Sequence, residues 1–138
     1  LVGRSLLIDW CVSLVIGDVP RGASVNLHPI AEAAWFGLFV TCLNLIPIGQ
    51  LDGGHVAYAL WGRKQRTIAL VMIPFLMALG YIGWLGWWLW VGLSSVMGVG
   101  HPPIPSPNSP IGHVRAVLGW ATVVLFILIF TPVPIVTR

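Results

Sequence analysis

The stretch "LNLIPIGQLDGGHVAYAL", residues 43–60, places polar and helix-breaking residues within an apolar part of the chain. It holds Asn44, Pro47, Asp52 and His55 together with three glycines. A carboxylate at membrane depth costs roughly 2.5–3.5 kcal/mol even on lenient insertion scales, so Asp52 must be partnered, hydrated or bound to a cation. Pro47 has no N–H and breaks the helix, and the glycines let the backbone leave helical geometry. Irregular backbone in a membrane is tolerated only where protein buries it or it lines a wet cavity, so the stretch indicates a site.

The composition indicates a membrane protein. Of the 138 residues, 57% are hydrophobic and 8% are charged, and the formal net charge is +3. A soluble domain is about a quarter charged, and so few charges do not cover a surface that faces water. We therefore expect an all-α, polytopic transmembrane helical bundle in the lipid bilayer, with one broken helix at the LDG motif (residues 51–53). The basic residues are too few and too scattered to predict a nucleic-acid partner.

The hydropathy pattern divides the chain into three regions. Residues 1–27 hold an apolar run that is too short to span a bilayer, then a polar turn, and predict an interfacial or re-entrant segment. Residues 28–62 predict a transmembrane segment that carries the LDG motif, with its first apolar part at 30–48. Residues 63–138 predict a transmembrane hairpin, a proline-rich loop and a final transmembrane helix.

The hairpin is predicted because residues 67–100 are continuously apolar. One helix of that length would be about 50 Å long, whereas a hydrocarbon core is roughly 30 Å thick. Glycines at residues 80–86 mark the turn between two shorter helices. The cluster of Arg63, Lys64 and Arg66 predicts a cytoplasmic loop by the positive-inside rule, and the hairpin returns the proline-rich loop to the same side.

Two further groups are expected to be structural. The tryptophans between residues 84 and 90 predict a lipid-facing or interfacial stripe, because indole rings favour the bilayer interface. Cys11 and Cys42 lie in apolar runs without a paired spacing, so we expect two buried thiols and neither a disulfide nor a zinc knuckle.

Asp52 and His55 are three residues apart and share one face if the segment is helical. Such a pair can supply two ligands to one metal ion. A simpler interpretation, favoured for a single pair, is that His55 caps a helix, forms a hydrogen bond or faces a pore. For a lone aspartate the simpler interpretation is a hydrated carboxylate at a helix end.

The segment "NLIPIGQLDGG", residues 44–54, resembles the second signature of the site-2 protease family of membrane-embedded zinc metalloproteases. That signature has the form N-x-x-P-x-x-x-L-D-G. It is matched at the expected spacing by Asn44, Pro47, Leu51, Asp52 and Gly53. The flanking sequence over residues 28–134 is similar to bacterial and plastid-type members.

The resemblance implies a set of roles. Asp52 would be the third ligand of a Zn²⁺ ion whose other two ligands are the histidines of an H-E-x-x-H helix. Asn44 would have a catalytic role, with its amide bonded to the substrate backbone or to the developing oxyanion. The implied activity is hydrolysis of peptide bonds in membrane-spanning protein substrates by a zinc metalloendopeptidase. The implied location is a multi-pass position in a membrane, expected to be a bacterial cell membrane.

The chain departs from the family pattern because it contains no H-E-x-x-H. None of its histidines is followed by glutamate; they are His28, His55, His101 and His113. We expect the chain to be the C-terminal part of a longer protein that carries the missing ligands upstream, and to be inactive alone. Two alternatives stay open: an inactive relative that binds membrane proteins, and a transporter segment in which Asn44, Asp52 and His55 conduct a cation or proton. The sequence does not indicate an oligomeric state.

Overall fold

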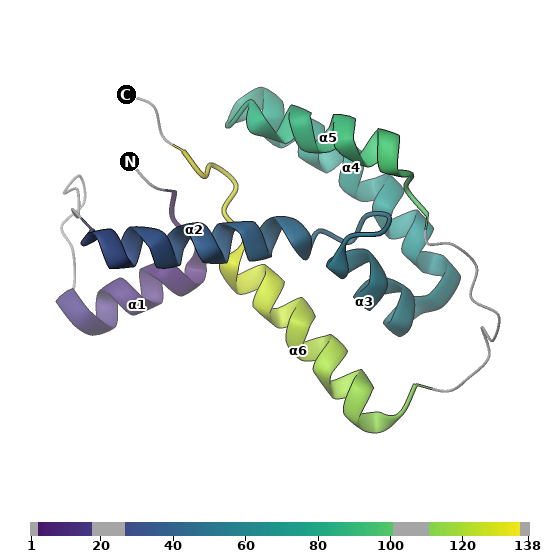
Figure 1. Cartoon of the computed structure of the whole chain (residues 1–138), viewed down its shortest axis with the longest axis horizontal. Helices are drawn as coiled ribbons and strands as arrows, with labels where there is room; N and C mark the ends of the chain where they lie inside the picture. The colour runs from purple at the N-terminus through teal and green to yellow at the C-terminus, as the bar shows by residue number, and fades with distance from the viewer. Residues whose placement is uncertain (1–2, 18–26, 101–110, 136–138) are drawn as a thin grey trace.

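A computed structural model describes residues 3–17, 27–100 and 111–135. In these ranges the chain forms α-helices and one short 3-10 helix, so the predicted all-α class is confirmed. The elements are α1 (Leu6–Ile16), α2 (Pro29–Asn44), α3 (Asp52–Trp61), η1 (Gly62–Lys64), α4 (Gln65–Ile82), α5 (Gly86–Met97) and α6 (His113–Ile129). Figure 1 shows α1 beside α2 and α5 beside α4, and α6 runs from the α1–α2 pair toward the region below α3. The predicted proline-rich loop lies almost wholly outside the described residues, as does His101.

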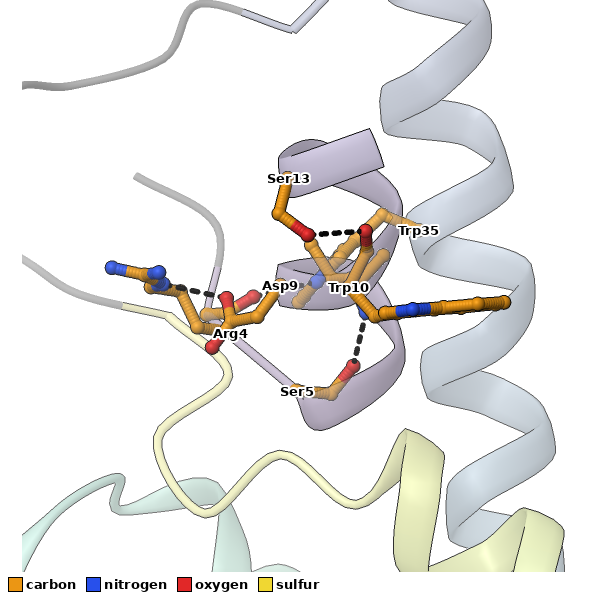
Figure 2. A network of polar contacts seen from close by, with 8 residues as sticks. Arg4, Ser5, Asp9, Trp10, Ser13 and Trp35 are labelled. Carbon is orange, nitrogen blue, oxygen red and sulfur yellow. Dashed lines mark hydrogen bonds and ion pairs between the residues drawn. The ribbon is translucent and has the colours of Figure 1, made fainter. Parts of the chain in front are cut away.

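The first two helices begin at side-chain caps. The Ser5 hydroxyl accepts a hydrogen bond from the Ile8 N–H at 3.3 Å, and Figure 2 shows this cap beside the ion pair of Arg4 with Asp9, whose atoms are 2.7 Å apart. In α2, the imidazole of His28 accepts from the Ile30 N–H at 3.3 Å, and Pro29 occupies the first helical position, where its missing N–H costs nothing. Helix α2 therefore begins at the N-terminal end of the segment predicted over residues 28–62.

The predicted break at the motif is also confirmed. Helix α2 ends at Asn44 and α3 begins at Asp52, with residues 45–51 in turns between them. Pro47 accounts for the break, because it donates no hydrogen bond and disfavours helical geometry in the residue before it. Helix α2 is therefore shorter than the apolar run at 30–48 from which it was predicted.

The predicted hairpin is formed by α4 and α5, which are joined by residues 83–85. Its two ends meet, since the Gln65 amide at the start of α4 donates to the Val99 carbonyl just after α5, at 3.4 Å. The same carbonyl accepts the Gly49 N–H at 3.3 Å. The turn that precedes Asp52 therefore lies at the end of the hairpin where α4 begins.

Two buried tryptophans tie the terminal segments to the core. The indole N–H of Trp35 donates to the Gly3 carbonyl at 2.8 Å, and that of Trp87 donates to the Pro132 carbonyl at 2.7 Å. The two segments also pair with each other, because the Gly3 N–H donates to the Pro134 carbonyl at 2.6 Å. Trp87 is 0% exposed and stacks on Phe130, so the prediction of a lipid-facing stripe is wrong for this residue.

Two other predictions are corrected by the structure. Cys42 is buried as expected, but Cys11 is exposed, because it lies on the outer side of α1. The basic cluster at residues 63–66 does not form an open loop. It occupies η1 and the start of α4, and the chain changes direction at Gly62, whose φ of 57° is favourable for glycine.

In the described part of the chain, the segment of residues 52–82 is long and apolar enough to cross a membrane by length and composition, although it comprises α3, η1 and α4 and turns at Gly62. Helix α4 supplies 18 of its residues, or about 27 Å, which is close to the thickness of a hydrocarbon core. Helices α1, α2 and α6 are shorter apolar helices. Large apolar side chains are exposed on the helices, and they include Val71, Leu89 and Val124.

We expect the two ends of the hairpin to lie on one side of the membrane and the α4–α5 turn to lie on the other. Single cysteines at Lys64 and Ile111 should react with a membrane-impermeant maleimide from the same side, and a cysteine at Tyr81, which is 86% exposed, from the opposite side. Gln65 is unsuitable for labelling because it is buried. The background should carry Cys11→Ser, since that thiol is exposed. Labelling of Lys64→Cys and Ile111→Cys from different sides would contradict the arrangement.

Candidate functional site

The turn before Asp52 (residues 45–51, here called the LDG turn) is anchored by alternating side chains. Ile46 and Ile48 are each 1% exposed and belong to the core cluster that includes Trp35 and Trp87. Gly49 follows Ile48 and precedes α3. Its φ is 55°, a conformation that other residues rarely adopt. The turn is therefore a packed structural element, although its backbone is not regular.

The first turn of α3 packs directly on this backbone. A Cβ added at Gly53 would collide with the Leu45 carbonyl, and one added at Gly54 would collide with the Gly49 carbonyl. Both glycines are buried, while Asp52 beside them is exposed. The close approach predicted for these glycines is thus made by the preceding turn of the same chain, and it sets the direction in which Asp52 leaves α3.

Asp52 is the first residue of α3, and its carboxylate lies at the positive end of the helix dipole, where a negative charge is favourable. Asn44 is the last residue of α2 and is also exposed. Neither side chain has a hydrogen-bond partner among the described residues. The two predicted site residues therefore present unused polar groups at the two ends of the LDG turn.

His55 is exposed and lies one turn after Asp52 on α3, so the two residues share a helix face as predicted. Among the described residues, no group of three or more histidine, cysteine, aspartate or glutamate side chains is placed to hold a metal ion. A zinc site takes three or four protein ligands. The exposed carboxylate of Asp52 fits one of these positions, and the described residues do not form a complete zinc site.

An apolar cavity of about 240 Å³ lies behind the motif. The LDG turn and α3 contribute Leu45, Pro47 and Gly53, and α6 contributes Thr122 and Phe126. Leu45 and Gly53, which line the cavity, directly follow Asn44 and Asp52 in the sequence. Apart from the Thr122 hydroxyl, which already donates to the Leu118 carbonyl at 2.9 Å, the side chains named here are apolar.

The LDG motif lies inside a region that matches a known family. Residues 12–81, about half of the chain, match the profile of peptidase family M50. The chain belongs to this family. The resemblance to the site-2 proteases, which form family M50, is thereby confirmed.

Several curated plant proteins are similar to this M50 chain. It is 42% identical over 91 residues to the probable zinc metalloprotease EGY2, chloroplastic, of Arabidopsis thaliana, a match that covers 65% of this chain and 16% of the relative. It is 30% identical over 122 residues to the probable zinc metallopeptidase EGY3, chloroplastic, of the same plant, covering 87% of this chain and 21% of the relative. The chain thus spans about a fifth of the length of these relatives. No solved structure matches it significantly.

The relatives bear on the expected location. EGY2 of Oryza sativa subsp. japonica, 41% identical over 91 residues, with 65% of this chain and 17% of the relative covered, is also named as chloroplastic. These relatives do not support the bacterial cell membrane that was expected from the sequence. The roles of Asp52 and Asn44 stay predictions.

We expect Gly53→Ala to destabilise the fold, because the added methyl group meets the Leu45 carbonyl and the first turn of α3 must shift. Overpacking of this kind costs about 1–3 kcal/mol. Gly37→Ala is the matched control, since Gly37 is a glycine of α2 with open space around it, where alanine is the better helix former. The measurement is unfolding of both variants in detergent. Equal stability of the two variants would contradict the close packing of α3 on the LDG turn.

Proposed function

We propose that this M50 chain is the LDG-bearing part of an intramembrane zinc metalloendopeptidase of the site-2 protease type. The observation that carries the proposal is an exposed carboxylate, Asp52, directed by two buried glycines at the end of a broken helix, inside the segment that matches the peptidase family. Family membership favours a peptidase over a transporter. The names of the relatives as probable zinc metalloproteases support zinc as the metal.

In this proposal Asp52 supplies one zinc ligand, and residues of the same longer protein supply the others. Zinc, when bound, supplies Lewis-acid activation of water and of the scissile carbonyl. The contribution of this chain is to fix the direction of the Asp52 carboxylate. The carboxylate leaves the first position of α3, and the packing of Gly53 and Gly54 on the LDG turn limits the movement of that position.

Asn44 acts on the substrate and does not act on the metal. Its amide lies at the opposite end of the LDG turn, exposed and without a partner among the described residues, so its N–H groups are available to a substrate carbonyl or to the negative charge that develops on it. The cavity beside Gly53 presents a mainly apolar lining next to the turn.

The proposal extends to topology and partners. The chain crosses a membrane several times as a helical bundle, with residues 28–62 carrying the site, residues 63–138 forming the hairpin and final helix, and residues 1–27 contributing an interfacial segment. Its substrates are membrane-spanning proteins. The apolar surfaces of α4, α5 and α6 support this arrangement, because a water-facing protein rarely exposes so many large apolar side chains.

In the full-length protein, Asp52→Asn should abolish cleavage and weaken zinc binding, because it removes the charge and keeps the size of the side chain. Asp9→Asn is the matched control, since Asp9 is an exposed aspartate on α1 whose ion pair with Arg4 is exposed and contributes little. The measurements are metal content by mass spectrometry and turnover of a membrane-spanning substrate. Full zinc and full activity in Asp52→Asn would return Asp52 to the role of a hydrated helix-end carboxylate.

Asn44→Ala should behave differently. It removes an amide donor and leaves the ligand in place, so zinc content should stay at the wild-type level while turnover falls by roughly 100-fold or more. Loss of zinc from Asn44→Ala would show that the residue supports the metal site and would contradict the assigned role.

The 138-residue chain alone should show no peptidase activity, because its described residues supply one clear ligand where a zinc site needs at least three. The chain, reconstituted in liposomes with zinc and a membrane-spanning substrate, should leave the substrate intact. Full-length protein in the same liposomes is the positive control. Chelator-sensitive cleavage by the chain alone would contradict the division of ligands. If the full-length protein is inactive and binds no zinc, the alternative of an inactive relative that binds membrane proteins is supported.

A further inference from the structure

The end of α5 packs against the LDG turn, backbone against backbone. A Cβ added at Gly49 would collide with the Gly98 carbonyl, so the two segments approach more closely than any other residue would permit. One residue later, the Val99 carbonyl accepts the Gly49 N–H at 3.3 Å. Among backbone hydrogen bonds between described residues, this is the one that joins the LDG turn to an element outside residues 41–55.

The Val99 carbonyl has a second donor. The side-chain Nε2 of Gln65 lies 3.4 Å from it, so Gln65 and Gly49 share one acceptor. Both distances are long for hydrogen bonds, and each bond alone is weak. A carbonyl oxygen has two lone pairs, and two donors from different elements fix its position better than one.

Gln65 is buried although its neighbours in sequence are not. It is 1% exposed, whereas Lys64 and Arg66 on either side are exposed. A buried primary amide is costly unless it is hydrogen-bonded, so the burial of Gln65 depends on the hydrogen bonds that its amide makes. Its position at the start of α4 brings its amide to the Val99 carbonyl, the same group to which the LDG turn is bonded through Gly49.

We propose that Gln65 is a positioning residue for Asp52. The Gln65 amide donates to the Val99 carbonyl, and this carbonyl also accepts the Gly49 N–H. The Gly49 carbonyl in turn packs against Gly54 in the first turn of α3. The direction of the Asp52 carboxylate therefore depends on the Gln65 amide. The proposal rests on the function proposed above only for its catalytic consequence. The connection between Gln65 and the LDG turn is a property of the chain itself.

The test compares Gln65→Met with wild type in the full-length protein. Methionine keeps the length and burial of the side chain and removes the donor. Hydrogen–deuterium exchange of the peptide that covers residues 45–51 should become faster, and exchange in α1 should not change. Zinc affinity, measured by competition with a chelator, should fall roughly five-fold, and kcat should fall by the same factor. Roughly five-fold is the ratio that corresponds to one hydrogen bond of ordinary strength. KM should stay within two-fold.

Two further variants separate positioning from general destabilisation. Ser5→Ala is the matched control, because it removes a buried hydroxyl and the cap of α1 far from the LDG turn in sequence; it should lower stability and leave zinc affinity unchanged. Gln65→Asn keeps the amide on a shorter side chain and should restore part of the lost affinity. If Gln65→Met does not fold, Gln65→Leu removes the same donor with a shorter apolar side chain.

Each outcome decides the proposal. Unchanged exchange at residues 45–51 in Gln65→Met overturns it, and so does faster exchange with unchanged zinc affinity and kcat. Equal losses of zinc affinity in Gln65→Met and Ser5→Ala also overturn it, because they would follow from stability alone. If the full-length protein neither binds zinc nor cleaves, the function proposed above fails, and faster exchange at the LDG turn still supports the role of Gln65 in holding it.

Discussion

The contact between the first turn of α3 and the backbone of the LDG turn determines where the candidate site lies. Pro47 ends the run that starts in α2, and the chain can restart as α3 against its own backbone only because Gly53 and Gly54 have no side chains. The buried side chains of Ile46 and Ile48 hold the turn in the core from the other side. Asp52 therefore has a defined direction although it is exposed and follows an irregular segment.

Much of this arrangement could be predicted from residue types with strong backbone effects. Pro47 predicted the break, and the glycines near residue 83 predicted the α4–α5 turn. These residues act on their own backbone, so their effect does not depend on distant partners. Asp52 was identified for a similar reason, since the cost of an unpartnered carboxylate in an apolar segment is a property of the segment.

Residues whose role depends on distant partners were not predicted correctly. Trp87 looked interfacial because indole rings often are, but its N–H is paired with a carbonyl 45 residues away. Gln65 lies within the basic cluster that predicts a cytoplasmic loop, between Lys64 and Arg66, but it is buried. The structure places it on the buried face of α4, where residues 65, 69, 76 and 80 recur at helical spacing. No complete metal site could be predicted, and among the described residues no three histidine, cysteine, aspartate or glutamate side chains are placed together to hold a metal ion.

The pairing of Gly3 with Pro134 has a consequence for the order of assembly. Gly3 precedes α1 and Pro134 follows α6, so their hydrogen bond forms only after α6 has been synthesised. Until then the indole N–H of Trp87 lacks its acceptor at Pro132, and the core stays open on that side. Contacts between residues so distant in sequence form late and slowly, because the loop that they close is long. We therefore expect closure of the core by the segment after α6 to come late in folding, with the apolar surfaces around Trp35 and Trp87 open to misassociation until then.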